Sequence, residues 1–282
     1  MEALAPGLYF VATPIGAARD ITLRALDILA SVDVLAAEDT RTLRRLMEIH
    51  GLQPGDRPIL AYHDHNGEKV RPRILAALGE GKSVAYASEA GTPLVADPGY
   101  QLARAAIEAG YSVIAAPGPS AVLAALTVSG LPSDRFLFAG FPPAGGASRR
   151  RWLEELASIP ATLILYESPK RISDLLTELR DSFGDNRQAA VCRELTKRFE
   201  EISRGTLGDL AIAFAGRPVK GEIVVVIDRA GHVAADPEEV EKRLREALKC
   251  HSIRDAAAEV SQAFGLPRRQ VYQTALRLSG AG

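Results

Sequence analysis

Cysteine, long apolar runs and an excess of charge of either sign are all scarce in this sequence of 282 residues. The two cysteines, Cys192 and Cys250, are too few for a disulfide framework and stand in no spacing typical of metal ligands. We expect both to be inert, partly buried thiols. No stretch of about 18 uninterrupted apolar residues is present, and residues 1–7 lack the charged start and apolar core of a signal peptide. We therefore expect a cytoplasmic protein with no membrane partner.

Basic and acidic side chains are nearly balanced. There are 34 Lys and Arg residues against 35 Asp and Glu residues, which gives a formal net charge of −1. Proteins that bind polyanions without specificity draw their affinity from many phosphate contacts and need an excess of positive charge. Any nucleic acid bound by this chain must therefore be contacted locally.

Several common site motifs are also missing. The sequence has neither G-x-G-x-x-G nor G-x-x-x-x-G-K-[ST], which excludes the usual nicotinamide, flavin and nucleoside triphosphate sites but leaves other nucleotide-like cofactors open. It also lacks H-E-x-x-H, C-x-x-C and G-x-S-x-G, so we expect no metal and no covalent nucleophile. His63 and His65 flank Asp64 and could bind a metal, although hydrogen-bonding loop residues are the favoured interpretation.

The composition is that of a globular protein, because apolar residues make up 47% of the chain and charged residues 24%. Short apolar runs alternate with helical patterns, which predicts α/β architecture with a largely parallel sheet in the first half. Gly51 and Gly110 close two of the helices at their C-cap positions. The predicted strands of this half are 8–12, 32–37, 59–62, 83–87 and 111–115, and the helices include 22–30, 40–50 and 101–109.

The same alternation resumes after Pro119. The runs 189–193 and 200–204 are too close for a helical crossover, so we predict that they pair antiparallel within a mixed second sheet. The other predicted strands are 136–139, 162–166 and 221–228, with helices near 150–157, 169–183 and 207–215.

Residues 231–237 form a predicted linker, and the pattern beyond it is helical at 238–249, 253–264 and 268–278. Gly265 and Pro267 supply a turn between the last two helices, as in a helix-turn-helix. The predicted domains are an N-terminal α/β domain over 1–118, a second α/β domain over 119–231 and a helical tail over 236–282.

Two loops rich in glycine and proline follow apolar strands. The first covers 88–93 and runs on to Asp97-Pro98-Gly99, and the second covers 117–121. In open α/β sheets ligands bind outside the carboxyl ends of the strands, and glycine lets the backbone approach a ligand. We expect one pocket at these loops, although each alone could be an ordinary strand-to-helix turn.

Charged residues leave two other strand ends. Glu38, Asp39 and Arg41 follow the second strand. Asp39 could either act on the substrate or cap the helix that follows. Glu167, Lys170 and Arg171 leave a strand of the second half, and they face the same crevice if the two domains pack with their loops together.

The order of these motifs resembles the ribosomal RNA small subunit methyltransferase I family of the tetrapyrrole methylase superfamily, over about residues 8–280. The shared segments are Ala-Thr-Pro-Ile-Gly at 12–16, Ala-Glu-Asp-Thr-Arg at 37–41, Tyr-His-Asp-His-Asn at 62–66, Ala-Gly-Thr-Pro at 90–93, Asp-Pro-Gly-Tyr at 97–100, Pro-Gly-Pro-Ser-Ala at 117–121, Phe-Leu-Phe-Ala-Gly-Phe at 136–141, Glu-Ser-Pro at 167–169 and Arg-Glu-Leu-Thr-Lys at 193–197.

The resemblance implies a two-domain tetrapyrrole-methylase-like fold with a helix-turn-helix-like tail. It further implies that S-adenosyl-L-methionine lies in a cleft between the two α/β domains. The methyl group would pass to the ribose 2'-hydroxyl of a cytidine near the P site, in the 16S rRNA of the small ribosomal subunit. A homodimer is compatible with it, since superfamily members are commonly dimers.

The resemblance and the motifs give three sets of expected site residues. The cofactor would be held by Thr13, Pro14, Ile15, Gly16, Ser88, Glu89, Ala90, Gly91, Thr92, Pro93, Pro117, Gly118, Pro119, Ser120 and Ala121. A sulfonium carries its own leaving group, so the protein must supply in-line positioning, and a carboxylate could take the hydroxyl proton. The candidates for that carboxylate are Asp39, which we favour, Glu38 and Glu167. The expected RNA contacts are Arg41, Arg149, Arg150, Arg151, Lys170, Arg171, Arg268 and Arg269.

Four positions depart from the family pattern, which usually has Asn at Ala17, Asp at Glu89, Ser at Ala96 and His at Lys170. Two other functions therefore stay open. One is a tetrapyrrole-type C-methyltransferase, against which the arginine triplet at 149–151 and the helical tail argue. The other is an RNA-binding assembly factor without catalytic activity.

Overall fold

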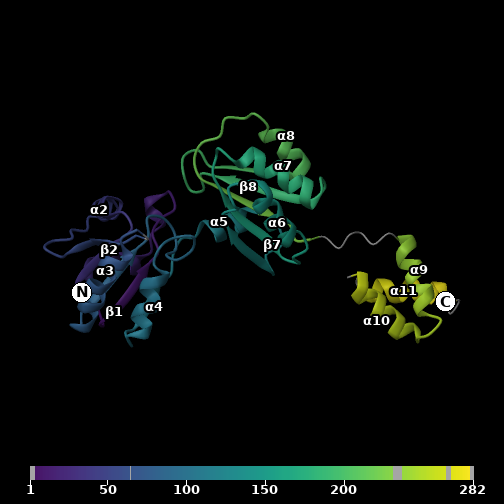
Figure 1. Ribbon diagram of the computed structural model, residues 1–282, viewed down its shortest axis with the longest axis horizontal. Helices are drawn as coiled ribbons and strands as arrows, with labels where there is room; N and C mark the ends of the chain where they lie inside the picture. Colours follow the sequence, from purple (N-terminus) through teal and green to yellow (C-terminus); the bar gives the residue numbers. More distant parts are fainter. Residues whose placement is uncertain (1–3, 64, 231–236, 265–267, 280–282) are drawn as a thin grey trace.

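The computed structural model describes residues 4–63, 65–230, 237–264 and 268–279 (Figure 1). Asp64, most of the predicted linker, and the Gly265 and Pro267 of the predicted turn lie outside these residues. None of the helices in the described ranges has both the length and the hydropathy needed to span a membrane.

The first sheet is entirely parallel, with the strand order β3-β2-β4-β1-β5. Its strands are β1 (Gly7–Val11), β2 (Val34–Ala37), β3 (Ile59–Ala61), β4 (Ser83–Ala87) and β5 (Val113–Ala116). The helices that connect them are α1 (Leu23–Ser31), α2 (Thr40–Ile49), α3 (Gly67–Gly79) and α4 (Tyr100–Glu108), with a short 3-10 helix at Ala18–Asp20. The predicted parallel architecture of this half is confirmed.

Helices cover both faces of this sheet, which explains why its central strands are apolar throughout. Side chains alternate between the faces along β1: Tyr9 and Val11 pack in the core beneath α1 and α2. Leu8 and Phe10 pack in the core beneath α3 and α4. All five residues of β1 are buried.

The second sheet is mixed, with the strand order β6-β7-β10-β8-β9. Its strands are β6 (Phe136–Gly140), β7 (Thr162–Glu167), β8 (Gln188–Arg193), β9 (Glu201–Thr206) and β10 (Ile223–Ile227). β6 and β7 are parallel, whereas β8 pairs antiparallel with β9 and β10, as β10 does with β7. The predicted antiparallel pairing of β8 and β9 is confirmed.

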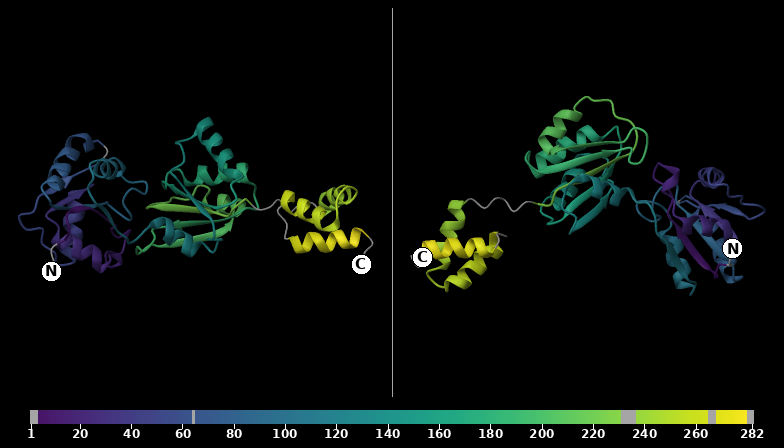
Figure 2. Two further views of the ribbon diagram at one scale, coloured as in Figure 1. Left: turned by 90° about the horizontal axis from the view of Figure 1, so that it is seen from below. Right: turned by 180° about the vertical axis from the view of Figure 1, so that it is seen from behind.

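Helices α6 (Gly146–Ala157), α7 (Ile172–Phe183) and α8 (Leu207–Phe214) pack on one face of this sheet, and α5 (Ala121–Ser129) packs on the other. Figure 1 labels α5 between the first domain and the second sheet, and Figure 2 shows helices on both sides of that sheet. Because α5 begins at the last residue of the 117–121 loop, this helix ties the loop to the second sheet.

Two helices were not among the predicted ranges. α5 is apolar all around its circumference, so it lacks the 3.6-residue periodicity by which a surface helix is detected. α3 contains Pro72, a residue that argues against a helix from sequence alone, yet Ile74 and Leu78 of this helix are buried against the sheet. Two starts also differ: α6 begins earlier than predicted, at Gly146, and α7 later, at Ile172.

The tail consists of α9 (Pro237–Ala247), α10 (Ile253–Phe264) and α11 (Arg268–Leu278). These helices enclose a small apolar core of their own that includes Leu244, Val260 and Val271. Cys250, between α9 and α10, is exposed, contrary to the expectation of a partly buried thiol, whereas Cys192 on β8 is buried as expected.

Candidate active site

Three loops at the carboxyl ends of β1, β4 and β5 are joined by hydrogen bonds. Thr13 and Gly91 exchange two backbone hydrogen bonds, each 2.9 Å from nitrogen to oxygen. The Ser88 Oγ donates to the carbonyl of Gly91 at 2.7 Å. The Thr92 Oγ1 donates to the carbonyl of Pro119 at 2.9 Å. The structure therefore brings together the three segments predicted to bind the cofactor.

Glycine is required where these loops approach one another. Gly91 has a φ of +79°, a conformation that side chains disfavour, and a Cβ there would lie 3.3 Å from the Ile15 Cγ2. A Cβ at Gly118 would lie 3.0 Å from the Cβ of Ala12. At both positions a Cβ would crowd a neighbouring segment, so backbone atoms form the contact between the segments.

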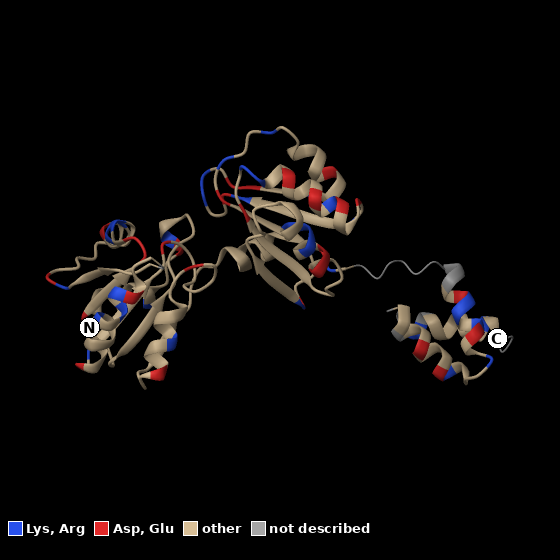
Figure 3. Cartoon of the chain, viewed as in Figure 1, with Lys and Arg blue, Asp and Glu red and all other residues tan. Residues whose placement is uncertain are grey.

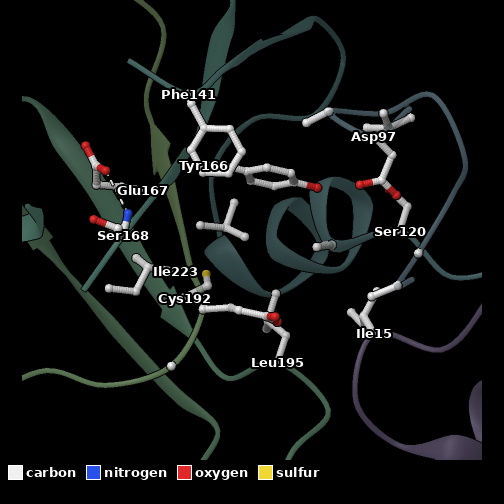
Figure 4. A pocket seen from close by; sticks show the side chains of 18 of the residues that line it. Ile15, Asp97, Ser120, Phe141, Tyr166, Glu167, Ser168, Cys192, Leu195 and Ile223 are labelled. Atoms are coloured by element: carbon white, nitrogen blue, oxygen red, sulfur yellow. Dashed lines mark hydrogen bonds between the residues drawn. The ribbon is translucent and has the colours of Figure 1, made fainter. Parts of the chain in front are cut away.

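A cavity of about 380 Å³ lies between these loops and the second sheet (Figure 4). Its size falls within the range of small-molecule sites, about 300–1,000 Å³. Residues from both domains line it: Ile15, Ala90, Gly91, Thr92, Val95, Ala96, Asp97, Ser120, Ala121, Phe141, Tyr166, Glu167, Ser168, Pro169, Cys192, Leu195, Gly221, Glu222, Ile223 and Val224. The walls are mostly apolar, with few carboxylates and hydroxyls among them.

The loop between β8 and β9 crosses from the second domain to the first. The backbone N–H of Ala17 donates to the Thr196 Oγ1 at 3.0 Å, and a Cβ at Gly16 would lie 2.5 Å from Lys197 Cγ. Glu194 and Thr196 have φ values of +51° and +64°, so this loop is held in a conformation that costs energy. The sequence pattern assigned this loop no role, because its contact with residues 16 and 17 depends on how the domains pack.

Glu167 is buried at the end of β7, with 2% of its surface exposed. The N–H of Ser168 and the Nε of Arg171 each donate to the Glu167 Oε1 at 2.7 Å, while no described residue donates to the buried Oε2. These bonds hold the loop that carries Ser168 and Pro169 against the cavity. Lys170 is exposed beside them.

Asp97 also lines the cavity, although our sequence analysis did not include it among the site residues. Burial, followed by the negative charges of Glu38 and Glu89, raises the pKa of Asp97 to about 7. Its Oδ2 is buried, and no described residue donates a hydrogen bond to it. Figure 4 shows the hydroxyl of Tyr166 pointing toward this carboxylate. Asp97 could have been identified in the sequence as a carboxylate that stands in a loop rich in glycine and proline.

Asp39 caps α2. It accepts a hydrogen bond from the backbone N–H of Arg41 at 2.7 Å and one from the Arg41 Nη2 at 2.8 Å. These bonds lower the pKa of Asp39 to about 2, and Asp39 is not among the residues that line the cavity. Glu38, its neighbour, acts electrostatically on Asp97 instead.

The predicted RNA contacts fall into two groups. Arg149 is buried, because its guanidinium donates to the carbonyls of Pro143 and Ala144 at 2.9 and 2.7 Å and pairs with Glu178. This position corrects the expectation that it meets RNA at the surface. Arg171 is half-buried beside Glu167. The other predicted contacts are exposed: Arg41, Arg150, Arg151, Lys170, Arg268 and Arg269. Figure 3 shows basic and acidic residues interspersed along the described parts of the ribbon.

Two family models together cover almost the whole chain. One, described as Tetrapyrrole (Corrin/Porphyrin) Methylases, matches residues 7–211, and the other, described as RsmI C-terminal HTH domain, matches residues 234–279. The fold agrees with the first. A uroporphyrin-III C-methyl transferase from Thermus thermophilus, in complex with S-adenyl homocysteine, superposes with a TM-score of 0.56 and 19% identity over 80% of this chain and 99% of that one.

Similarity to relatives extends over nearly the full length. A ribosomal RNA small subunit methyltransferase I from Mesorhizobium japonicum is 47% identical over 99% of this chain and 95% of its own length. One from Xylella fastidiosa is 45% identical over 95% of this chain and 98% of its own length. The order of motifs, the paired sheets with their shared cavity, and these similarities agree. The chain belongs to the ribosomal RNA small subunit methyltransferase I family of the tetrapyrrole methylases.

Proposed function

We propose that this protein transfers a methyl group from S-adenosyl-L-methionine to the ribose 2'-hydroxyl of a cytidine near the P site, in the 16S rRNA of the small ribosomal subunit. The observation that carries this proposal is the identity of 45–47% with relatives named ribosomal RNA small subunit methyltransferase I. This similarity extends over nearly the entire chain, including the tail. A macrocycle methylase has no need of the tail, and a separate family model matches this tail.

The residues around the cavity fit such a cofactor. Apolar side chains such as Ile15, Val95 and Ile223 offer a dry surface for an adenine ring, and the cavity is large enough for a ligand of this class. The buried carboxylate oxygens of Asp97 and Glu167 have no donor among the described residues, so they suit a group that brings positive charge and N–H or O–H donors.

When bound, the cofactor supplies an activated methyl group whose leaving group is a neutral thioether. The protein then has to position the hydroxyl in line with this group and exclude water. We assign the holding of the cofactor to the loops at 13–16, 88–93 and 117–121, whose hydrogen bonds to one another fix their backbone. The loop at 194–200 contributes Leu195 from the opposite domain.

The substrate side is formed by exposed basic residues on several elements. Arg41 at α2, Arg150 and Arg151 at α6, and Lys170 could each contact phosphate, as could Arg268 and Arg269 at the start of α11. These positions are spread over all three predicted domains. We propose that a local set of contacts, and not a broad basic face, directs the RNA to the cavity.

Two measurements test the function. Calorimetry should detect binding of S-adenosyl-L-methionine, and the labelled methyl group should pass to small ribosomal subunits isolated from cells that lack this enzyme. Uroporphyrinogen III serves as the control acceptor and should stay unlabelled. Transfer to the macrocycle instead would support a tetrapyrrole methylase, and particle binding without any transfer would support an assembly factor.

A further inference from the structure

Two carboxylates in the cavity have a buried oxygen that receives no hydrogen bond from the described residues. These are Glu167 and Asp97. Glu167 is paired, because its other oxygen accepts from Arg171 and from the N–H of Ser168. Asp97 has no such cationic partner among the residues that interact with it. Of these two, Asp97 is therefore the carboxylate more available to a bound molecule.

The groups that face Asp97 come from three elements. Glu38 at the end of β2 and Glu89 in the loop after β4 repel its negative charge. Tyr166 of β7 points toward it (Figure 4), and burial first, then the charge of Asp97, raises the pKa of this phenol to about 12. Arg41 interacts with Glu89 and not with Asp97 itself. The carboxylate thus titrates near neutral pH beside a phenol that stays protonated.

A general base must reach the proton, be free of a fixed cationic partner, and titrate near the working pH. Asp39 fails the second and third conditions, because Arg41 holds its pKa at about 2. Asp97 meets the second and third conditions, and its place in the cavity wall sets it beside a bound molecule. Tyr166 can donate a hydrogen bond to an oxygen held between the two side chains.

We propose, on the basis of the function proposed above, that Asp97 is the catalytic residue that accepts the proton of the substrate hydroxyl. The hydroxyl oxygen forms a bond to the methyl carbon, while the bond from that carbon to the sulfonium sulfur breaks and leaves its electron pair on sulfur. The O–H bond breaks, and the proton passes to Asp97 Oδ2. Deprotonation of Asp97 by solvent then restores the base.

The same arrangement couples Asp97 to cofactor binding. A cation that binds in this cavity favours the ionised carboxylate and lowers its pKa. Binding of S-adenosyl-L-methionine at pH 7 should therefore release a fraction of a proton. S-adenosylhomocysteine lacks the sulfonium charge and should release less. The number of protons released is obtained from the binding enthalpy in buffers of different ionisation enthalpy.

The test compares wild-type protein with Asp97→Asn and with the matched control Asp27→Asn, an exposed aspartate of α1. The kcat/KM of wild-type transfer to small subunits, which reports the free protein, should show an acid limb with an apparent pKa near 7. Asp97→Asn should transfer at least about 100-fold more slowly, bind the cofactor within about threefold, and release no proton on binding. Asp27→Asn should behave as wild type in all three measurements.

A second variant moves the titration without removing the base. Glu38→Gln removes a negative charge that raises the pKa of Asp97, so the acid limb of transfer and the proton release should both move to lower pH. If Asp97→Asn transfers at the wild-type rate, or loses cofactor affinity in parallel with rate, the assignment of the base is wrong while the proposed function stands. If wild-type protein methylates no small subunits, the proposed function fails and takes this assignment with it.

Discussion

At the scale of single residues, Gly91 shows how the cavity depends on backbone conformation. Its φ of +79° costs a residue with a Cβ about 1–2 kcal/mol, and the added atoms would press on Ile15. Gly91→Val should therefore lower the affinity for the cofactor at least about tenfold, measured by calorimetry, in a protein that still folds.

Gly110 provides the control for this variant. Its φ of +80° is nearly the same, but a Cβ there would meet nothing within 4 Å. Gly110→Val should lower the melting temperature through the same backbone strain and bind S-adenosyl-L-methionine normally. Normal binding by folded Gly91→Val would contradict the assignment of the loop to the cofactor.

Asp39 tests whether a carboxylate near the cavity is catalytic or structural. Its hydrogen bonds to Arg41 are those of a helix cap, so Asp39→Ala should lower the melting temperature and leave single-turnover transfer close to normal. Because the folded pKa of Asp39 is depressed to about 2, this stabilisation is present above pH 3.8 and is lost as the pH falls through 2. A rate about 100-fold lower with unchanged stability would restore Asp39 as the base.

Asp97 should destabilise the free protein as the pH rises. Its folded pKa of about 7 lies above the ordinary value of 3.8, so the stability it contributes is present below 3.8 and is lost as the pH rises through 7. Asp97→Asn, which does not ionise, should gain melting temperature relative to wild type over this interval, and the difference should level off above pH 8. Parallel melting curves for the two proteins would show that Asp97 is not desolvated.

At the scale of elements, α6 begins where Arg149 is anchored. The buried guanidinium satisfies the carbonyls of Pro143 and Ala144, and its removal leaves these groups and Glu178 without a partner. Arg149→Ala should therefore cost about 2–3 kcal/mol in the free energy of unfolding. The neighbouring Arg150→Ala should stay within about 0.5 kcal/mol of wild type, because Arg150 is exposed. Denaturant unfolding of the two variants measures whether the buried arginine contributes more to the free energy of unfolding than the exposed one.

The sequence predicted the strands well and two helices poorly, for physical reasons. Strands such as β4 are buried along their whole length and mostly apolar, since both faces of the sheet are covered, and their limits are visible in the sequence. α5 has no polar face, and α3 contains Pro72, so the usual indications of a helix are missing. Patterns along the chain report local structure, and these two helices depend on packing against a sheet.

The site follows the same division. The glycine and proline of the cofactor loops could be recognised because each loop leaves its own strand. Arg149 stands in an arginine triplet, and nothing in the sequence distinguishes the one that is buried. The charge of Asp97 depends on Glu38 and on burial between two domains, and the contact of Thr196 with Ala17 spans 179 positions of sequence. The domain limits and the assigned roles of the site residues stay predictions.

At the scale of the whole molecule, the tail has a core of its own and carries Arg268 and Arg269 at the start of its last helix. Deletion of residues 236–282 should leave cofactor binding intact and weaken binding to the small ribosomal subunit. The salt dependence of binding should become shallower, because fewer phosphates are neutralised. Full-rate methylation by the truncated protein over a series of salt concentrations would make the tail a structural element.

The position of the transferred methyl group distinguishes methylation of the ribose from methylation of a base. Small subunits from cells without this enzyme would be incubated with the protein and labelled S-adenosyl-L-methionine, and their 16S rRNA would be digested to nucleosides and separated by mass. We expect the label to appear in 2'-O-methylcytidine and Asp97→Asn to reduce it at least about 100-fold. Label on a base, or no label in RNA from the wild-type reaction, would contradict this expectation.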